Sequence, residues 1–183
     1  IHLGALGDGG AITTHDDELP TTARSIANYG ATEKYVHLYQ GINSRLDELQ
    51  AAVLSIKLSR LDKDNARRRE IAQSYKENID WQRLGLQSTV HTDHINEANV
   101  FHILPVFSPR RNELQRYLTQ CGISTQNHYP IPPHRQEALK KEYGMQQLPI
   151  TERIHNEELS LPISPLLTNE ETEHIINRIN AFI

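Results

Sequence analysis

The chain has 183 residues, a formal net charge of −4 and 37% hydrophobic residues, the composition of an ordinary globular protein. Its negative charge gives no reason to expect nucleic acid or an anionic membrane as a partner, and no apolar run approaches the ~20 residues of a membrane span. The single cysteine, Cys121, excludes an intrachain disulfide, and with no recognisable signal peptide we expect a cytoplasmic protein.

Glycine is concentrated at the start of the chain, at Gly4, Gly7, Gly9 and Gly10. Because glycine adopts positive φ without a Cβ clash and lets other groups approach the backbone, the cluster indicates a turn that runs beneath a ligand. A tight turn without a ligand explains the same residues. The spacing matches neither a dinucleotide fingerprint nor a phosphate-binding loop.

Capping residues and apolar spacing predict the elements of the first half in chain order. They are a strand over 11–14, a helix to about residue 28, a loop over 34–41, and a long helix from Ser44 to about residue 78 with a break near Ser59. Thr14 or Asp16 is expected to cap the first helix and Gly30 to end it. The helix from Ser44 carries the strongest apolar periodicity of the chain.

The stretch over 80–99 has little periodicity, and a strand-like alternation of residues follows it. The predicted elements are a strand over 100–107, a helix over 108–121, a strand over 123–128, helices over 135–143 and 150–158, and a C-terminal helix opened by a capping box at 168–171. This order predicts a small α/β domain at about 80–183, beside the C-terminal part of a larger one.

Four segments resemble one known family in order and spacing. They read Leu-Gly-Ala-Leu-Gly-Asp-Gly-Gly at 3–10, Gly-Ile-Asn-Ser-Arg-Leu-Asp-Glu-Leu-Gln at 41–50, His-Tyr-Pro-Ile-Pro-Pro-His at 128–134, and Leu-Ser-Leu-Pro-Ile at 159–163. Together they resemble the C-terminal half of the sugar-nucleotide aminotransferases, the DegT/DnrJ/EryC1/StrS family.

The resemblance implies an α/β protein of fold type I that depends on pyridoxal 5'-phosphate. Residues 1–79 would then form the C-terminal part of the large cofactor-binding domain with a long interdomain helix, and residues 80–183 the small C-terminal α/β domain. The implied reaction is amination of a nucleotide-linked keto-deoxysugar, at C3, with glutamate as amino donor. Such a product serves polysaccharide or glycoconjugate biosynthesis, and the implied assembly is a homodimer with shared active sites.

The chain has no lysine at the family's catalytic lysine position. Counting back from Gly4 places that position at Ile1, which cannot bind the cofactor covalently. The chain either begins just past the lysine, or the lysine is truly replaced. One branch of the family has a histidine there and performs dehydration, so His2, one position out of register, keeps a dehydratase variant open. A non-catalytic homologue that retains the dimer surface is the competing class, and a binding module without cofactor is a third.

The resemblance also implies binding residues. Asn43 would reach the cofactor phosphate of a neighbouring subunit, although an N-cap role alone explains an asparagine there. Arg45 would bind the same phosphate or pair with Asp47 or Glu48.

Substrate contacts are implied for Tyr35, His37, His128 and His134. Tyr35 and His37 lie in a loop, where exposed side chains of these types are also common. His128 and His134 bracket a proline-rich turn stiff enough to form a pocket wall, and a purely structural turn is the alternative. No metal site is predicted at His91 and His94, with His102 farther on, because the segment is not convincingly helical and no acidic partner stands at a telling spacing.

Overall fold

The computed structural model describes residues 3–91 and 99–183, and contacts divide the chain into two compact units. The first unit is Ile1–Leu61 and the second is Asp62–Ile183. The domain boundary expected between residues 79 and 80 stays a prediction about the whole protein. Here the residues after Leu61 cluster with the C-terminal elements.

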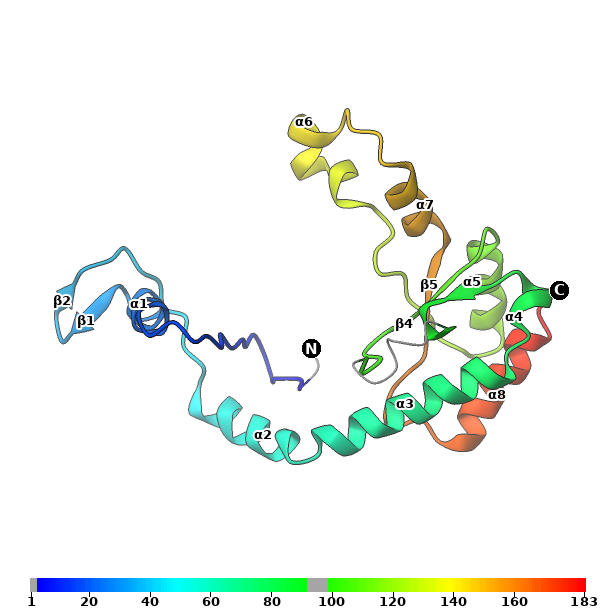
Figure 1. Ribbon diagram of the computed structural model, residues 1–183, viewed down its shortest axis with the longest axis horizontal. Helices are drawn as coiled ribbons and strands as arrows, with labels where there is room; N and C mark the ends of the chain where they lie inside the picture. Colours follow the sequence, from blue (N-terminus) through cyan, green and yellow to red (C-terminus); the bar gives the residue numbers. More distant parts are fainter. Residues whose placement is uncertain (1–2, 92–98) are drawn as a thin grey trace. The chain divides into compact units, whose positions relative to one another are not determined.

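The first unit holds two helices and a short hairpin, coloured blue to cyan in Figure 1. Its elements are α1 (Glu18–Ala27), β1 (Ala31–Glu33), β2 (Val36–His37) and α2 (Glu48–Leu58). The strand expected over 11–14 is absent, since these residues join no ladder. The loop expected over 34–41 instead contains the hairpin turn and β2, which pairs antiparallel with β1. Two- and three-residue strands are too short to leave an alternating pattern.

The N-cap residue of α1 is Asp17, but the capping side chain is that of Asp16, whose Oδ1 accepts hydrogen bonds from the N–H groups of Glu18 and Leu19. It ends in a Schellman-type turn, in which the Gly30 N–H donates to the Ser25 carbonyl at 2.7 Å. The residue after the C-cap is Tyr29, at φ 60°, so the helix ends earlier than the expected Gly30.

Gly30 itself has φ 76°, and a Cβ on it would lie 1.7 Å from the Tyr39 carbonyl oxygen. A side chain at this position is therefore excluded both by conformation and by space.

The first unit has almost no interior. Among residues 3–61 only Ser25 and Gly30 are buried, and helix α2 has no buried residue at all. Large apolar side chains such as Leu49 and Ile56 of α2 are exposed. This unit is consequently not stabilised by a hydrophobic core of its own.

The second unit holds a three-stranded antiparallel sheet and its covering helices. Its elements are α3 (Leu61–Asn78), α4 (Trp81–Leu84), β3 (Gln87–Ser88), η1 (Thr89–His91), β4 (Leu104–Phe107), α5 (Arg111–Gln120), η2 (Pro133–Arg135), η3 (Glu137–Leu139), α6 (Lys140–Tyr143), α7 (Pro149–Glu157), β5 (Glu158–Leu161) and α8 (Asn169–Asn180). The break predicted near Ser59 is confirmed, because Ser59 caps the end of α2 and α3 begins at Leu61.

Strand β4 is the middle of the sheet in the order β3-β4-β5, although it contains Pro105. Proline is tolerated here because of its partner. Opposite it, Ser160 exchanges both backbone hydrogen bonds with Gln126, so it needs no N–H donor from Pro105. The expected strand over 123–128 is reduced to this one bridge at Gln126.

Three helices supply the core of the second unit. Their buried side chains, Ile71 and Tyr75 of α3, Leu114 and Leu118 of α5, and Ile175 and Ile179 of α8, pack with Leu104, Val106, Leu159 and Leu161 of the sheet. Figure 1 shows α3 and α8 running side by side. Hydrogen bonds join α3 to both ends of α8: Arg67 donates to Asn169 Oδ1, and Asn180 donates to the Asn78 carbonyl.

The C-terminal helix follows its sequence signals closely. Thr168 Oγ1 accepts from the Glu171 N–H at 3.1 Å, and the Glu171 carboxylate accepts from the Thr168 N–H at 2.9 Å. The predicted capping box is thus formed in both directions.

Between β4 and β5 the chain reaches out from the sheet as an arm that carries α6 and α7 (Figure 1). The helix expected over 135–143 is broken into η2, η3 and α6. The cause is Gln136, whose extended backbone, with ψ 138°, interrupts the run. The helix expected over 150–158 is present as α7.

Candidate functional site

Asn43 and Arg45 form a pair before helix α2. Arg45 Nε donates to Asn43 Oδ1 at 3.0 Å, and this bond fixes the orientation of the amide. Within the described residues, Asn43 Nδ2 and the two Nη groups of Arg45 have no partner. The pair is exposed, so an amide donor and a guanidinium are available together for an anion. These residues fit the role of phosphate ligands.

The alternative role of Asn43 as an N-cap is wrong. Its backbone forms a bridge with Asn28, so the helix cannot begin there, and α2 starts at Glu48 with Asp47 as its N-cap. For the same reason the helix begins later than expected, at Glu48 instead of Ser44. Arg45 pairs with Asn43 and, among the described residues, makes no ion pair with Asp47 or Glu48.

His37 and Asn43 flank the same turn, the segment that follows α1. His37 lies opposite Ala31 in the hairpin, and its Nδ1 is 3.0 Å from the Tyr29 carbonyl oxygen. Because a carbonyl only accepts, Nδ1 carries the proton and Nε2 is the free ring nitrogen. Asn43 joins the other side of the turn through its bridge with Asn28.

Tyr35 occupies the tip of the hairpin and is 82% exposed. Its backbone has φ 69°, a left-handed conformation that is unfavourable for a tyrosine and that is found preferentially at functional positions. Lys34 Nζ lies 5.1 Å from the centre of its ring. An exposed aromatic ring held in this way is suited to contact a ligand.

His128 is tied to strand β5 by a chain of hydrogen bonds. Its Nδ1 lies 2.8 Å from Ser160 Oγ, and Ser160 Oγ donates to Glu158 Oε1 at 2.6 Å. The other carboxylate oxygen of Glu158 accepts from the His128 backbone N–H, also at 2.6 Å. The peptide bond between His128 and Tyr129 is cis. The half-buried imidazole is therefore held from both its ring and its backbone.

His134 is 5% exposed, and its Nε2 lies 3.0 Å from Glu152 Oε1. The same oxygen accepts from Arg135 Nη2 at 2.8 Å. These hydrogen bonds, His134 first and Arg135 second, lower the pKa of Glu152 from 4.5 to about 2. The contacts fasten the proline-rich turn to α7, while a contact between His134 and substrate stays a prediction.

Sequence reasoning missed Glu158, Ser160 and Glu152. All four residues of β5 are buried, and a buried glutamate and serine need hydrogen-bond partners. A charged residue at the start of an apolar strand was the available signal. Glu152 gave no signal, because its partners are far away in the sequence.

Two of the N-terminal glycines, Gly4 and Gly7, lie against helix α2. Gly4 has φ 73° and its carbonyl accepts from Lys57 Nζ, while a Cβ on Gly7 would lie 3.6 Å from Gln50. Gly10 has open space around it. Gly4 alone of the four has the left-handed backbone that favours glycine. Ile1 and His2, on which the lysine position and the dehydratase variant depend, lie outside the described residues.

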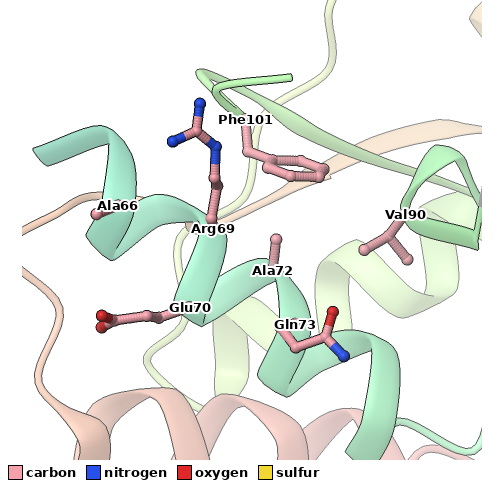
Figure 2. Close-up of a pocket in the computed structure, with 7 residues that line it drawn as sticks. All are labelled: Ala66, Arg69, Glu70, Ala72, Gln73, Val90 and Phe101. Carbon is pink, nitrogen blue, oxygen red and sulfur yellow. The ribbon is translucent and has the colours of Figure 1, made fainter. Parts of the chain in front are cut away.

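A separate pocket of about 470 Å³ lies against α3. Figure 2 shows Arg69 beside Phe101, with Glu70 pointing the other way. None of the predicted binding residues lines this pocket. It is therefore distinct from the candidate site.

Within the described residues no cluster of side chains is suited to a metal ion, and no helix is long and apolar enough to cross a membrane. His94, one of the three histidines considered for a metal, lies outside them.

Comparison with known proteins gives one consistent result. Residues 2–180 match the DegT/DnrJ/EryC1/StrS aminotransferase family. A dTDP-3-amino-3,6-dideoxy-alpha-D-galactopyranose transaminase from Aneurinibacillus thermoaerophilus is 50% identical over 174 residues, which is 95% of this chain and 47% of that protein.

Solved structures agree. DesV of Streptomyces venezuelae, crystallised in complex with a ketimine intermediate, superposes with a TM-score of 0.89 at 39% identity, over 98% of this chain and 48% of that one. NtdA of Bacillus subtilis, with bound cofactor PMP, gives 0.87 at 27% identity, over 96% and 42%. The chain thus spans about half the length of the relatives it matches.

Proposed function

Because the chain belongs to the DegT/DnrJ/EryC1/StrS aminotransferase family, we propose that it forms the C-terminal half of a pyridoxal-phosphate-dependent sugar-nucleotide aminotransferase. The observation that carries the proposal is the 50% identity, over 95% of the chain, to a transaminase named for a dTDP-linked 3-amino sugar. The substrate is a nucleotide-linked keto-deoxysugar aminated at C3, and glutamate is the amino donor.

Residues 1–79 belong to the large domain in this proposal and residues 80–183 form the small one. The protein works as a cytoplasmic homodimer in polysaccharide or glycoconjugate biosynthesis. The single cysteine, Cys121, supports a reducing compartment. The exposed apolar side chains of α2 support an assembly in which further protein covers that helix.

The cofactor, when bound, supplies an electron sink that lets an amino group pass from donor to sugar. Asn43 Nδ2 and the Arg45 guanidinium hold its phosphate, because both are donors without a partner among the described residues. The bond between them orients the two donors before the anion arrives, which lowers the entropy cost of binding.

Tyr35, His37, His128 and His134 contact or border the substrate in this proposal. Tyr35 presents an aromatic face, on which the apolar side of a sugar ring can stack. His37 and His128 each have one ring nitrogen bonded within the chain, so the other nitrogen is left for a sugar hydroxyl. His134 holds the turn in place through Glu152.

The test uses the full-length protein supplied with pyridoxal phosphate. We expect glutamate to be converted to 2-oxoglutarate, and a dTDP-linked 3-keto-6-deoxyhexose to gain an amino group detected by mass spectrometry. Borohydride reduction before digestion maps the residue that carries the cofactor. A protein that takes up no cofactor and forms neither product is a non-catalytic homologue. Loss of water from the sugar without amination identifies the dehydratase variant.

A further inference from the structure

Strand β5 contains a buried polar pair that the proposed chemistry leaves unused. Glu158 and Ser160 are 4% and 5% exposed, in a strand whose other residues are apolar. Burying a carboxylate and a hydroxyl is costly unless both are fully hydrogen-bonded. Hydrogen bonds connect the Glu158 carboxylate to the Ser160 hydroxyl and the Ser160 hydroxyl to the ring of His128.

The direction of each proton follows from the chemistry of the groups. An ionised carboxylate only accepts, so the Ser160 hydroxyl donates its single proton to Glu158 Oε1. Ser160 Oγ can then only accept from the imidazole, which places the proton of His128 on Nδ1. A neutral His128 therefore carries its lone pair on Nε2, and this atom has no partner within the described residues.

We propose that Glu158 and Ser160 are positioning residues that hold His128 in its Nδ1–H tautomer, so that Nε2 accepts a hydrogen bond from a hydroxyl of the sugar substrate. This inference rests on the proposed function, in which His128 contacts that substrate. The hydrogen bond from the His128 backbone N–H to Glu158 Oε2 also fixes the position of the backbone that carries the imidazole.

Two side chains from neighbouring helices hold the backbone beside these hydrogen bonds. From α5, the buried Arg111 donates through Nη1 to the Glu158 carbonyl oxygen at 3.1 Å, which ties the backbone at the start of β5 to that helix. From α7, His155 Nδ1 bonds the carbonyl oxygen of Tyr129, the residue that follows His128. The Tyr129 ring stands edge-on to the imidazole, with 5.4 Å between ring centres.

Glu158→Gln is the decisive variant, because glutamine has the shape of glutamate but reverses the direction of the hydrogen bonds that run from His128 through Ser160. The His128 N–H needs an acceptor, so the amide oxygen must face it and the amide NH₂ must face Ser160 Oγ. Ser160 then donates to His128 Nδ1, and the ring proton moves to Nε2. Ser160→Ala breaks the link altogether. Glu171→Gln, in the capping box of α8, is the matched control, since glutamine also serves in such a box.

The tautomer is measured on full-length protein carrying ¹⁵N-labelled histidine, by long-range ¹H–¹⁵N correlation at pH 8, where free imidazoles are neutral. His128→Gln assigns the signal. We expect Nδ1–H in the wild type and in Glu171→Gln, and Nε2–H in Glu158→Gln. A wild-type protein with the proton on Nε2 overturns the proposal, and this outcome does not depend on any variant folding.

Kinetics provide the second arm. In Ser160→Ala we expect KM for the keto-sugar to rise about tenfold, the effect of one lost or misdirected hydrogen bond, with KM for glutamate unchanged. An unchanged KM for the sugar overturns the substrate part of the proposal. If the wild type transfers no amino group while the tautomer switches as expected, the proposed function fails and the positioning of His128 stands.

Discussion

Arg45 Nε donates a hydrogen bond to Asn43 Oδ1 over 3.0 Å. Within the described residues, the N–H groups of Asn43 Nδ2 and of both Arg45 Nη atoms have no partner. The pair sits on a short stretch between the bridge at Asn43 and the N-cap of α2 at Asp47. Both ends of this stretch are fixed, so the two donors are presented together.

Asn43→Asp tests the pair. The aspartate keeps an acceptor for Arg45 but replaces the amide donor with a negative charge, which repels a phosphate. We expect affinity for pyridoxal phosphate to fall about tenfold to a hundredfold, the range for one charge-assisted hydrogen bond. Cofactor titration followed by absorbance measures it. Asn112→Asp, an exposed position in the second unit, is the control for the charge change, and equal losses in both variants would contradict the role.

Gly30→Ala is expected to disrupt the turn after α1. The left-handed conformation costs an alanine about 1–2 kcal/mol, and the contact of its Cβ with the Tyr39 carbonyl adds to that cost. Gly10→Ala is the matched control, because nothing lies within 4 Å of its Cβ position. Hydrogen exchange at the Leu38 amide, which donates to the Gly30 carbonyl, reports on the turn. Equal protection in the two variants would show that the turn tolerates a side chain.

Glu152 is expected to make stability depend on pH at the acid end. Its pKa of about 2 in the folded chain is below the 4.5 of an unperturbed glutamate, so the ionised form favours folding. The contribution is complete above pH 4.5 and is lost as pH falls toward 2. Urea unfolding from pH 2 to 6 should therefore show a rise in stability that Glu152→Gln lacks. Parallel profiles would mean that His134 and Arg135 do not hold this carboxylate.

Thr168→Ala removes one half of the capping box of α8. We expect a loss of about 1 kcal/mol in the free energy that opens this helix, since Glu171 N–H then has no side-chain acceptor. Hydrogen exchange of the α8 amides measures the loss. Thr168→Ser retains the hydroxyl and should behave like the wild type; a serine variant as unstable as the alanine one would assign the effect to the lost methyl group.

Local signals in the sequence predicted the elements that depend on local physics. The capping box at Thr168, the helix break at Ser59 and the cap of α1 by Asp16 are all confirmed. Each of these depends on residues within one helical turn, so a single sequence contains the necessary information. The family was also predicted, because long motifs are specific where single glycines are not.

Elements set by distant partners were not predictable in the same way. Asn43 looked like an N-cap because its pairing with Asn28 cannot be read from its neighbours. The strand expected over 123–128 is a single bridge because Ser160 meets the chain only at Gln126. The chain from Glu158 to His128 joins residues 30 positions apart, and only the fold brings them together.

Pro105 also affects which backbone groups of the sheet are available to pair with another strand. Its carbonyl accepts from Ser88 Oγ, and its nitrogen has no hydrogen to offer at the level where β3 has ended. On the other side of the sheet, Gln126 already occupies the backbone of Ser160. Among the described residues, Pro105 therefore has no backbone donor at this level, and both backbone groups of Ser160 are already paired with Gln126. At this level of the sheet, an added strand from another molecule would find few backbone groups to pair with, which limits edge-to-edge association there.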